Sequence, residues 1–372
     1  MSIEIKKVKT KKDLKNFIDF PWIVYKNDPN WVPPLKTEVA HMINKNKYAF
    51  WEHADRELFL AYKDGKIAGR IAAIIDENHN KFHNDNIGFF GFFESQNDGE
   101  VSKALFDAAK DWLKQQGRDT MRGPMNPSMN DECGLLIEGF DSPPAIMMTY
   151  NPKYYIDLIE QYGFTKAKGL VAFYKDASKG IPDRVKRLME HIRQKTGVEV
   201  RSLDMKNFYR DVEIIKDVYN KSWEKNWGFV PMTNKEMDAL AEALKPIAEP
   251  ELVKFAFVKG KPVGVSIVLP NLNELLIKFN GKMNLINIIR FLTGRKKIKG
   301  ARAIVFGFIE GYRQTGLPLV LYYETEVSGL KLGYEWVELS WNLEDNDLIN
   351  KFDSMLGGHI YKRYNLYDYK IN

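Results

Sequence analysis

The sequence is poor in cysteine and has no long apolar run, and both absences limit what the protein can be. Its 372 residues include one cysteine, Cys133, so an intramolecular disulfide cannot form, which suits a reducing compartment. No uninterrupted apolar stretch approaches the roughly 18 residues that a membrane-spanning helix needs. The opening residues, MSIEIKK, lack the apolar segment of a secretory signal peptide. We therefore expect a cytoplasmic protein.

Several familiar site motifs are also absent. The chain has no Walker A loop, no dinucleotide fingerprint and no Gly-x-Ser-x-Gly elbow. His79 and His83 stand four positions apart, but no further ligand lies near them in the sequence, so we expect no metal. The net charge of +6 fits an anionic ligand, an acidic membrane surface or an ordinary solvated exterior. Only one dense basic cluster occurs, so we expect no DNA partner.

What the chain does contain is a repeat of about half its length. The hairpin-like segment LFLAYKDGKIAG, with its turn at Gly65, recurs as LVKFAFVKGKPVG, with its turn at Gly260, 195 positions later. Near the ends of the two halves, Gly357 follows Gly163 by 194 positions, whereas the segment IGFFGFF recurs as IVFGFI after 217. An offset that drifts and returns indicates one unit of fold present twice, each copy with its own insertion.

Length and composition agree with two domains, each able to bury a core, because 44% of the residues are hydrophobic and 13% are aromatic. In the first half, periodicity and turn signals predict strands at 3–8, 58–63, 67–76, 87–93, 119–123 and 168–175, helices at 100–116 and 152–162, and a polar loop at 77–86. In the second half they predict strands at 198–203, 303–309, 335–341 and 359–369, a hairpin at 252–269, and helices at 205–224, 233–247, 317–332 and 346–356. The fold class is α/β, with domains at 1–176 and 198–372 joined by a linker with a basic helix at 177–197.

One segment of the second half has the form of a phosphate site. An apolar strand at 304–309 leads through a short loop into the helix at 317–332, so several backbone N–H groups and the positive end of a helix dipole meet at one place. Gly316 permits close approach of a ligand to the backbone, and Pro318 suits a first helical turn. The alternative is an ordinary helix start, which has the same appearance in sequence.

The order of elements resembles the GCN5-related N-acetyltransferase (GNAT) superfamily, in which the acyl-CoA loop reads Arg/Gln-x-x-Gly-x-Gly/Ala after the fourth strand. Arg313 and Gly316 match this loop, while Pro318 replaces its last small residue and removes one amide donor. Asn346 and Gly357 match the Asn…Gly-Phe pattern of the fourth helix, with glycine in place of phenylalanine at the next position. The first half has the pattern at Asn151 and 163–164 but lacks the Arg-x-x-Gly loop, so its acyl-CoA loop is degenerate.

More specifically, the whole chain resembles a bacterial family of tandem GNAT proteins described as acetyltransferases. The resemblance is carried by GPMNPSMNDECG (123–134), YNPKYY (150–155), NWGFVPMT (226–233) and ELSWNLEDN (338–346). Some members of that family are associated with N-acylation of long-chain amino-lipid bases on the way to ceramide-type lipids. The resemblance therefore implies two tandem GNAT-like domains, each a mixed sheet flanked by helices, and an acyl-CoA or acetyl-CoA co-substrate.

The resemblance also implies site residues in the second half. It places acyl-CoA against Phe308, Ile309, Arg313, Gln314, Thr315, Gly316 and Leu317. In the fold's reaction two parallel strands splay apart, a backbone N–H polarises the thioester carbonyl, and a carboxylate or histidine takes the amine proton. The chain departs from better-known relatives, since Asp353 stands where many carry tyrosine and Arg302 where some carry glutamate.

The catalytic base is accordingly expected after the fifth strand. The catalytic residues that we predict are Glu344, Asp345 and Asn346, with Glu338 on the strand itself as a weaker candidate. Acidic residues just before Asn346 are equally well explained as capping groups of the following helix, and both interpretations stay open. Cys133 is expected to be a small core residue rather than a nucleophile.

The acceptor is expected between the halves, where ligand sites often lie. The insertion at 125–150 is rich in Pro, Asn and Met, and the substrate-binding residues that we predict are Asn126, Asn130, Glu132 and Trp227. Each has a simpler alternative, because asparagines in turns often bind only backbone and Trp227 suits helix packing on the sheet.

The insertion at 278–302 joins aliphatic residues to a basic cluster. Its segment 283–299 suits contact with a membrane interface or the cover of an acyl-chain channel. A surface helix with a solvated basic end explains it as well. The first interpretation implies a cytoplasmic protein peripheral to the inner membrane face.

Three functions compete at this point. The leading one is an acyl-CoA-dependent N-acyltransferase that moves an acetyl or longer acyl group to an amine, which includes long-chain amino-lipid bases. The second is a tandem GNAT transferase that uses aminoacyl-tRNA, which the basic insertion suits and the Arg-x-x-Gly loop does not. The third is a ligand-binding protein that has lost its chemistry. The sequence leaves the oligomeric state and the acyl chain length open.

Overall fold

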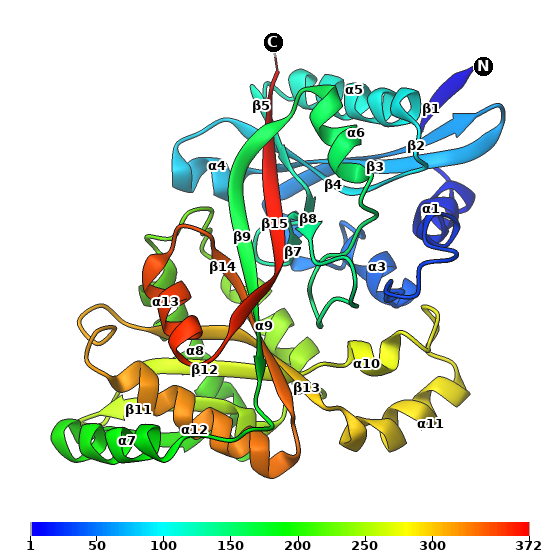
Figure 1. The fold of residues 1–372 in the computed structure, drawn as a ribbon. Helices are drawn as coiled ribbons and strands as arrows, with labels where there is room; N and C mark the ends of the chain where they lie inside the picture. Colours follow the sequence, from blue (N-terminus) through cyan, green and yellow to red (C-terminus); the bar gives the residue numbers. More distant parts are fainter. Residues whose placement is uncertain (1, 372) are drawn as a thin grey trace.

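A computed structural model describes residues 2–371 of the protein as two α/β halves (Figure 1). The first half contains the strands β1 (Ile3–Lys7), β2 (Ala54–Lys63), β3 (Lys66–Asp76), β4 (Ile87–Ser95), β5 (Thr120–Gly123), β6 (Met125–Asn126), β7 (Glu132–Cys133), β8 (Leu135–Glu138) and β9 (Thr165–Asp176). The second half contains β10 (Glu199–Ser202), β11 (Val253–Val258), β12 (Lys261–Pro270), β13 (Gly300–Phe308), β14 (Trp336–Leu343) and β15 (His359–Lys370).

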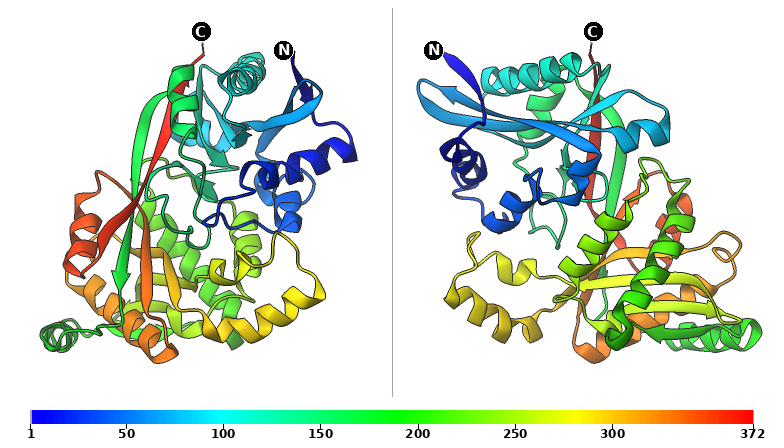
Figure 2. Two further views of the ribbon diagram at one scale, coloured as in Figure 1. Left: turned by 45° about the vertical axis from the view of Figure 1, so that its right-hand side comes forward. Right: turned by 180° about the vertical axis from the view of Figure 1, so that it is seen from behind.

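Helices cover the sheet in both halves (Figure 2). The first half has α1 (Lys11–Asp19), α2 (Pro21–Val24), α3 (Lys36–Met42), α4 (Glu77–His83), α5 (Gly99–Gln115), α6 (Tyr155–Tyr162) and the 3-10 turn η1 (Ala49–Glu52). The helix α7 (Asp183–Thr196) follows, as the basic segment predicts, and then α8 (Phe208–Trp223), α9 (Asn234–Leu244), α10 (Asn273–Leu276), α11 (Leu285–Gly294), α12 (Leu317–Leu332) and α13 (Asp347–Met355). The 3-10 turns η2 (Met205–Asn207), η3 (Pro250–Leu252) and η4 (Arg295–Lys297) complete the second half.

The two predicted hairpin turns are confirmed and share one geometry. Asp64 and Gly65 have φ values of 49° and 77°, and Lys259 and Gly260 have 50° and 73°. Two successive positive φ values give the tight turn whose twist matches that of paired strands, so the repeated glycine has a backbone reason. The helix predicted at 317–332 is α12, whose two flanking glycines are both left-handed.

The polar segment 77–86, predicted as a loop, instead contains the helix α4, so that prediction is wrong. The carboxylate of Asp76 accepts hydrogen bonds from the backbone N–H groups of Asn78 and His79, which caps the helix. Asn84 ends it in a left-handed conformation. The helix is therefore stabilised by capping at both ends. The segment has no apolar periodicity from which a helix could have been predicted.

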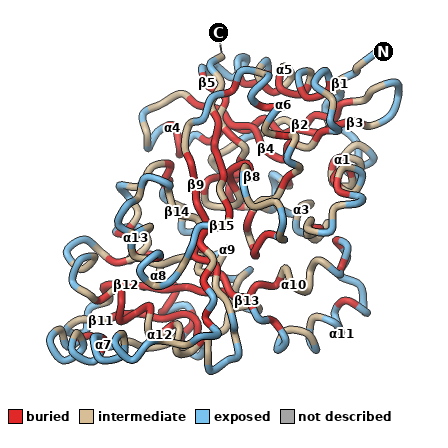
Figure 3. The backbone as a smooth tube through the Cα atoms, viewed as in Figure 1, coloured by how far each residue is buried: buried red, intermediate tan, exposed pale blue. Residues whose placement is uncertain are grey.

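The halves exchange their last strands. In the single large sheet the order is β1-β2-β3-β4-β5-β15-β9-β14-β13-β12-β11-β10, with β8 beside β15. The final strand of the second half thus pairs with β5 of the first, and β9 of the first half pairs with β14 of the second. Figure 2 shows β9 and β15 running side by side through both halves. Neither half completes its sheet without a strand of the other. Buried residues follow these central strands (Figure 3).

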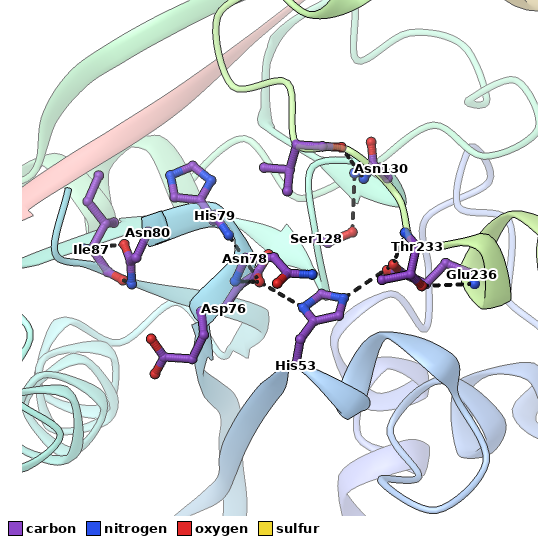
Figure 4. A network of polar contacts seen from close by, with 12 residues as sticks. His53, Asp76, Asn78, His79, Asn80, Ile87, Ser128, Asn130, Thr233 and Glu236 are labelled. Carbon is purple, nitrogen blue, oxygen red and sulfur yellow. Dashed lines mark hydrogen bonds and ion pairs between the residues drawn. The ribbon is translucent and has the colours of Figure 1, made fainter. Parts of the chain in front are cut away.

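A charged contact also ties the halves together. The imidazole of His53 lies between the carboxylates of Asp76, 2.9 Å away, and Glu236, 3.2 Å away, the latter on α9 of the second half (Figure 4). Burial lowers the pKa of His53, but the two carboxylates outweigh it and raise the value to about 9. At neutral pH the ring is therefore a buried cation shared by both halves.

This pKa predicts a pH-dependent stability. Because the folded pKa lies above the ordinary value of 6.5, the contribution of His53 is fully present below about pH 6.5 and is lost as the pH rises through about 9. We expect the unfolding free energy to fall by roughly 2–3 kcal/mol over that range and less in the His53→Gln variant. Urea unfolding at several pH values measures both. Equal losses in the two proteins would contradict the assignment.

Candidate active site

The site begins where two parallel strands of the second half separate. The pairing of β13 with β14 covers only Gly300–Ala303 and Trp336–Leu339, so the remainder of each strand turns an unpaired edge toward the other. On its other side β13 stays paired with β12 through an irregularity of register beside Ile304. Such bulges re-aim strand groups beside active sites. The predicted splay of the two strands is confirmed.

A cavity of about 410 Å³ passes along this gap. Its walls come from α8, α9, the ends of β13 and β14, the start of α12 and α13, and the first-half segment 129–131. The apolar lining residues are Met129, Met147, Ile215, Trp223, Trp227, Phe229, Met232, Met237, Leu240, Leu244, Ile267, Ile304, Val305, Phe306, Phe308, Pro318, Trp341, Leu343, Leu348, Ile349 and Phe352. The polar ones include Asn130, Asp131, Tyr219, Asn226, Arg302, Arg313, Ser340, Asn342 and Asn346. The cavity therefore joins the predicted phosphate loop to the other half.

The loop before α12 lies at one end of this cavity. Phe308 and Arg313 line the cavity, whereas Gln314 and Thr315 are exposed. The Arg313 guanidinium donates to the backbone carbonyls of Phe308 at 3.0 Å and Ser222 at 2.6 Å, which ties the loop to α8. Arg313 is thus a support of the loop, with its charge held beside the cavity.

Several amides of this loop have no partner within the protein. Among residues 2–371, no acceptor lies within hydrogen-bond distance of the backbone N–H groups of Arg313, Gln314, Gly316 or Leu317. Gly316 has a φ of 83°, and a Cβ there would lie 3.0 Å from Ile192 of α7. Unpaired amides at a helix start suit an anionic group. Leu317 is buried in a core cluster with Ile309 at its margin, so both anchor the loop.

The equivalent gap in the first half is filled by the chain itself. The pairing of β4 with β5 stops at Phe89 and Arg122. Beyond it, the side-chain carbonyl of Asn126 accepts a hydrogen bond from the backbone N–H of Phe92 at 2.6 Å. A Cβ on Gly91 would lie only 1.6 Å from the carbonyl oxygen of Met125. Residues 125–126 therefore occupy the space that is open in the second half.

This placement corrects part of the predicted acceptor pocket. Asn126 fills the first-half gap and does not line the cavity, and Glu132 lies behind it, paired with it in the β6–β7 ladder. Asn130 and Trp227 do line the cavity, and their role in acceptor binding stays a prediction. The Asn130 amide donates to the Val230 carbonyl at 3.2 Å. Sequence spacing could not show which of these side chains face the cavity. Successive side chains of a strand point to opposite faces, and the strands β6 and β7 contain Asn126 and Glu132.

Asp131 is a cavity residue that the sequence reasoning missed. One carboxylate oxygen accepts from the Ser128 hydroxyl at 2.6 Å, and the other accepts from the Tyr48 hydroxyl. Burial raises the pKa of Asp131 to about 6, although both hydrogen bonds oppose that rise. At neutral pH it is a carboxylate inside a mostly apolar cavity. The sequence pointed to Asp131 only through its place between Asn130 and Glu132, which are both predicted acceptor residues.

Glu344 and Asp345 are not brought to the cavity. They lie after β14, where Lys166 donates to Glu344 at 2.6 Å and Lys168 donates to Asp345 at 2.5 Å. Side-chain exposures of 39% and 62% place them in solvent. Asn346 does line the cavity and precedes α13, although its side chain makes no capping hydrogen bond.

Asp353 faces a smaller cavity of about 140 Å³ that opens on the same gap from the side of α12. The two cavities share lining residues from both separated strands, among them Ile304 and Asn342. The Asn342 amide donates to Asp353 at 2.8 Å. Burial raises the pKa of Asp353 to about 7, and the Asn342 hydrogen bond opposes it only in part. At neutral pH this carboxyl group is therefore only partly ionised.

A buried polar cluster lies where the paired parts of β13 and β14 end and the gap begins. Arg302 donates to Ser340 Oγ at 2.9 Å and to the first-half carbonyls of Ile146 and Met147 at 2.8 and 2.9 Å. Glu338, fully buried, lies 3.4 Å from the guanidinium and accepts from the Ser340 and Tyr361 hydroxyl groups. Since Arg302 neutralises Glu338 and is itself fully engaged, this cluster positions the strands. Glu338 therefore does not reach the cavity as a free base.

Metal and membrane-spanning features are not found in residues 2–371. No three or more His, Cys, Asp or Glu side chains in this part of the chain gather as a metal site would require. The rings of His79 and His83 lie with their centroids 4.5 Å apart and are tilted by 41°, and burial lowers the pKa of His79 to about 3. No helix among these residues has the length and apolarity to cross a bilayer.

Two proteins align with this chain over nearly its full length. The bacterial ceramide synthase of Caulobacter vibrioides is 36% identical over 373 residues, which cover 97% of this chain and 96% of that protein. The chain belongs to its family. Protein YghO of Escherichia coli, another family member, is 34% identical over 370 residues, which cover 97% and 94%. No protein-family model matches the chain.

Solved structures of low sequence identity share the fold of this chain. A tandem GNAT protein from the clavulanic acid biosynthesis pathway covers 100% of this chain and 99% of its own, with a TM-score of 0.58 at 10% identity. A GCN5-related N-acetyltransferase from Sphaerobacter thermophilus covers 100% and 96%, with a TM-score of 0.54 at 12% identity. The predicted tandem GNAT fold is confirmed, and the family makes the chain an N-acyltransferase.

Proposed function

We propose that the protein transfers an acyl group from acyl-CoA to the amine of a long-chain amino lipid. The observation that carries this proposal is the continuous cavity from the α12 loop, through the gap between β13 and β14, to Asp131 of the first half. The acyl donor is proposed to enter at the α12 end and the acceptor at the Asp131 end. The ceramide synthase relative supports a lipid acceptor of this kind.

The division of labour follows from the two gaps. We propose that the second-half domain, 198–372, binds acyl-CoA, because its gap is open and its loop amides are unpaired. The first-half domain, 1–176, contributes acceptor-side residues, since its own gap is filled by residues 125–126. The linker 177–197 contributes α7, whose Ile192 side chain packs beside Gly316.

The chemistry needs three groups. Unpaired amides of the α12 loop bind the pyrophosphate, while backbone N–H groups along the gap polarise the thioester carbonyl as negative charge develops. Asp131 binds the ammonium group of the acceptor and takes one proton, which leaves a neutral amine to attack. The C–N bond forms as the C–S bond breaks, and the carboxyl proton of Asp353 passes to the leaving thiolate. The acylated nitrogen then loses its second proton to solvent, and solvent returns a proton to Asp353. The pair Glu344 and Asp345 stays a competing candidate for the base.

A lipid acceptor fits the walls of the cavity. Met237, Leu240 and Leu244 form one side of it, all from α9, and Ile215 of α8 faces the same space. Apolar side chains stabilise an alkyl chain by roughly 0.8 kcal/mol for each buried CH₂ group. Methionines adapt their shape to such chains. A short polar amine would leave these walls uncovered.

Binding of acyl-CoA provides the first test. Acyl-CoA should raise the melting temperature of the protein by linkage, and Gly316→Glu should abolish this rise, because a carboxylate there repels phosphate and displaces Ile192. Gly333→Glu is the matched control, since Gly333 has a similar φ of 90° and caps the other end of α12. Equal shifts in all three proteins would count against the proposal. Strongly salt-dependent tRNA binding would favour the aminoacyl-tRNA alternative instead.

A further inference from the structure

The helix α11 presents its apolar side chains to solvent. Leu285 is 72% exposed, Leu292 70%, Ile286 62% and Ile289 54%. In Figure 3 this helix lies at the lower right, away from the buried sheet. A soluble surface helix normally does the reverse and turns its apolar stripe to the core. This helix therefore suits surroundings that are themselves apolar.

The one deeply buried side chain of α11 is polar. Asn287 is 4% exposed and donates to the backbone carbonyls of Phe279 and Lys282 at 3.2 and 2.8 Å. Its backbone N–H is bonded to the side chain of Asn284, which caps the helix. The inner face is thus held by hydrogen bonds, so the orientation of the helix does not depend on burying its aliphatic residues.

The chain segment that contains α11 is basic along its whole length, and of its basic residues Lys299 pairs with Glu335 of another segment. Residues 275–300 contain seven lysines and arginines and no acidic residue, while the whole chain carries +6, so all the other residues together carry −1. The basic residues are Lys278, Lys282, Arg290, Arg295, Lys296, Lys297 and Lys299. Most of them are exposed. Basic side chains beside exposed aliphatic ones match a bilayer with anionic headgroups.

The end of α11 is tied to the chain that follows α9, one of the helices that line the cavity. The Arg295 guanidinium donates to the carbonyls of Pro246, Ile247 and Ala248, directly after α9. Phe291 packs in the same core cluster as Leu244. The chain just after α9, a helix whose side chains line the cavity, is therefore tied by Arg295 to the end of α11, and the outer face of α11 is the exposed aliphatic one.

We propose that the outer face of α11, with the basic residues at its ends, docks on an anionic lipid bilayer. Docking sets the α9 wall of the cavity next to the membrane, so a long-chain amine passes from the bilayer into the cavity without crossing water. This inference rests on the proposed lipid acceptor. The helix lies in the interface and does not span it, since ten residues are too few.

Vesicle binding tests the proposal. The full chain should co-sediment with vesicles of equal parts phosphatidylglycerol and phosphatidylcholine and bind pure phosphatidylcholine at least roughly tenfold more weakly. Leu285→Asp/Ile289→Asp should weaken binding to the mixed vesicles at least roughly tenfold. Leu188→Asp/Leu332→Asp is the matched control, because these residues are also exposed, at 46% and 43%, and should change binding little. Lys296→Gln/Lys297→Gln should lower binding more at low salt than at high salt.

Four results would overturn the proposal. They are no binding of the unaltered protein to either vesicle, equal binding to both vesicles, equal losses in the α11 and control variants, and a dimer in light scattering that the α11 variant abolishes. The last would make the face a contact between two copies. The rise of melting temperature with acyl-CoA, measured without vesicles, depends on Gly316 and not on α11. It therefore separates failure of the docking proposal from failure of the proposed function.

Discussion

Replacing Asp131 with asparagine is expected to lower kcat/KM for amine acylation by roughly 10²–10⁴-fold. The variant keeps the shape of the side chain, and its amide oxygen can accept from one of the hydroxyl groups of Ser128 and Tyr48 while its NH2 group donates to the other, but it cannot take a proton. Its fold and its acyl-CoA-induced rise in melting temperature should be unchanged, because Asp131 lies at the end of the cavity that we propose for the acceptor and not at the α12 loop. Steady-state kinetics with an amine acceptor gives the measurement.

The matched control is the double variant Glu344→Gln/Asp345→Asn. These carboxylates are exposed and paired with Lys166 and Lys168, so their loss should change activity by less than roughly threefold. Both variants remove negative charge and leave the size of the side chain nearly the same. The opposite outcome, an inactive double variant and an active Asp131→Asn protein, would return the base to the pair after β14.

Replacing Asp353 with asparagine is expected to lower kcat by roughly 100-fold and to change its pH dependence. Burial raises the pKa of Asp353 to about 7, so in the unaltered protein the proton donor is lost as the pH rises through that value. The kcat of the unaltered protein should therefore fall on the alkaline side, and the variant should lack this fall. A pH profile between 5 and 9 is the measurement, and an unchanged profile would contradict the role.

The same substitution separates catalysis from stability. Because the folded pKa exceeds the ordinary value of 3.8, the stabilising contribution of Asp353 is fully present below about pH 4 and is lost as the pH rises through about 7. Asparagine stays neutral and can still accept from Asn342. At pH 8 the variant should therefore be more stable to urea, by as much as about 4 kcal/mol, while it is less active. A variant that is both less stable and less active would indicate a structural role alone.

The sequence predicted those turns and helix ends that depend on the residue type at one or two positions. The ends of α12 follow from Gly316 and Gly333, and the two hairpins follow from Gly65 and Gly260, because a positive φ is favoured at these positions by residue type alone. The sequence missed α4, since its stability comes from the Asp76 cap and not from apolar periodicity.

The site itself is decided by contacts between the halves. Asp131 and Trp227 reach one cavity although 96 positions separate them, and Arg302 binds carbonyls of the other half. The charge pairs that hold Glu344 and Asp345 in solvent come from β9 of the first half. No periodicity within one segment reports such pairings, because they depend on which strands meet across the sheet.

By itself the sequence determined that this chain is a duplicated GNAT unit with an Arg-x-x-Gly loop in its second copy and an aliphatic, basic insertion. Residue type and spacing are enough to predict these features, because turns, helix caps and amphipathic periodicity depend on residues that are close together in the sequence. Only the tertiary structure decided that β9 and β15 change places, that residues 125–126 close the first gap, and that the second gap opens toward Asp131. Those features arise when distant strands pair, and pairing across the sheet is set by the packing of the whole chain.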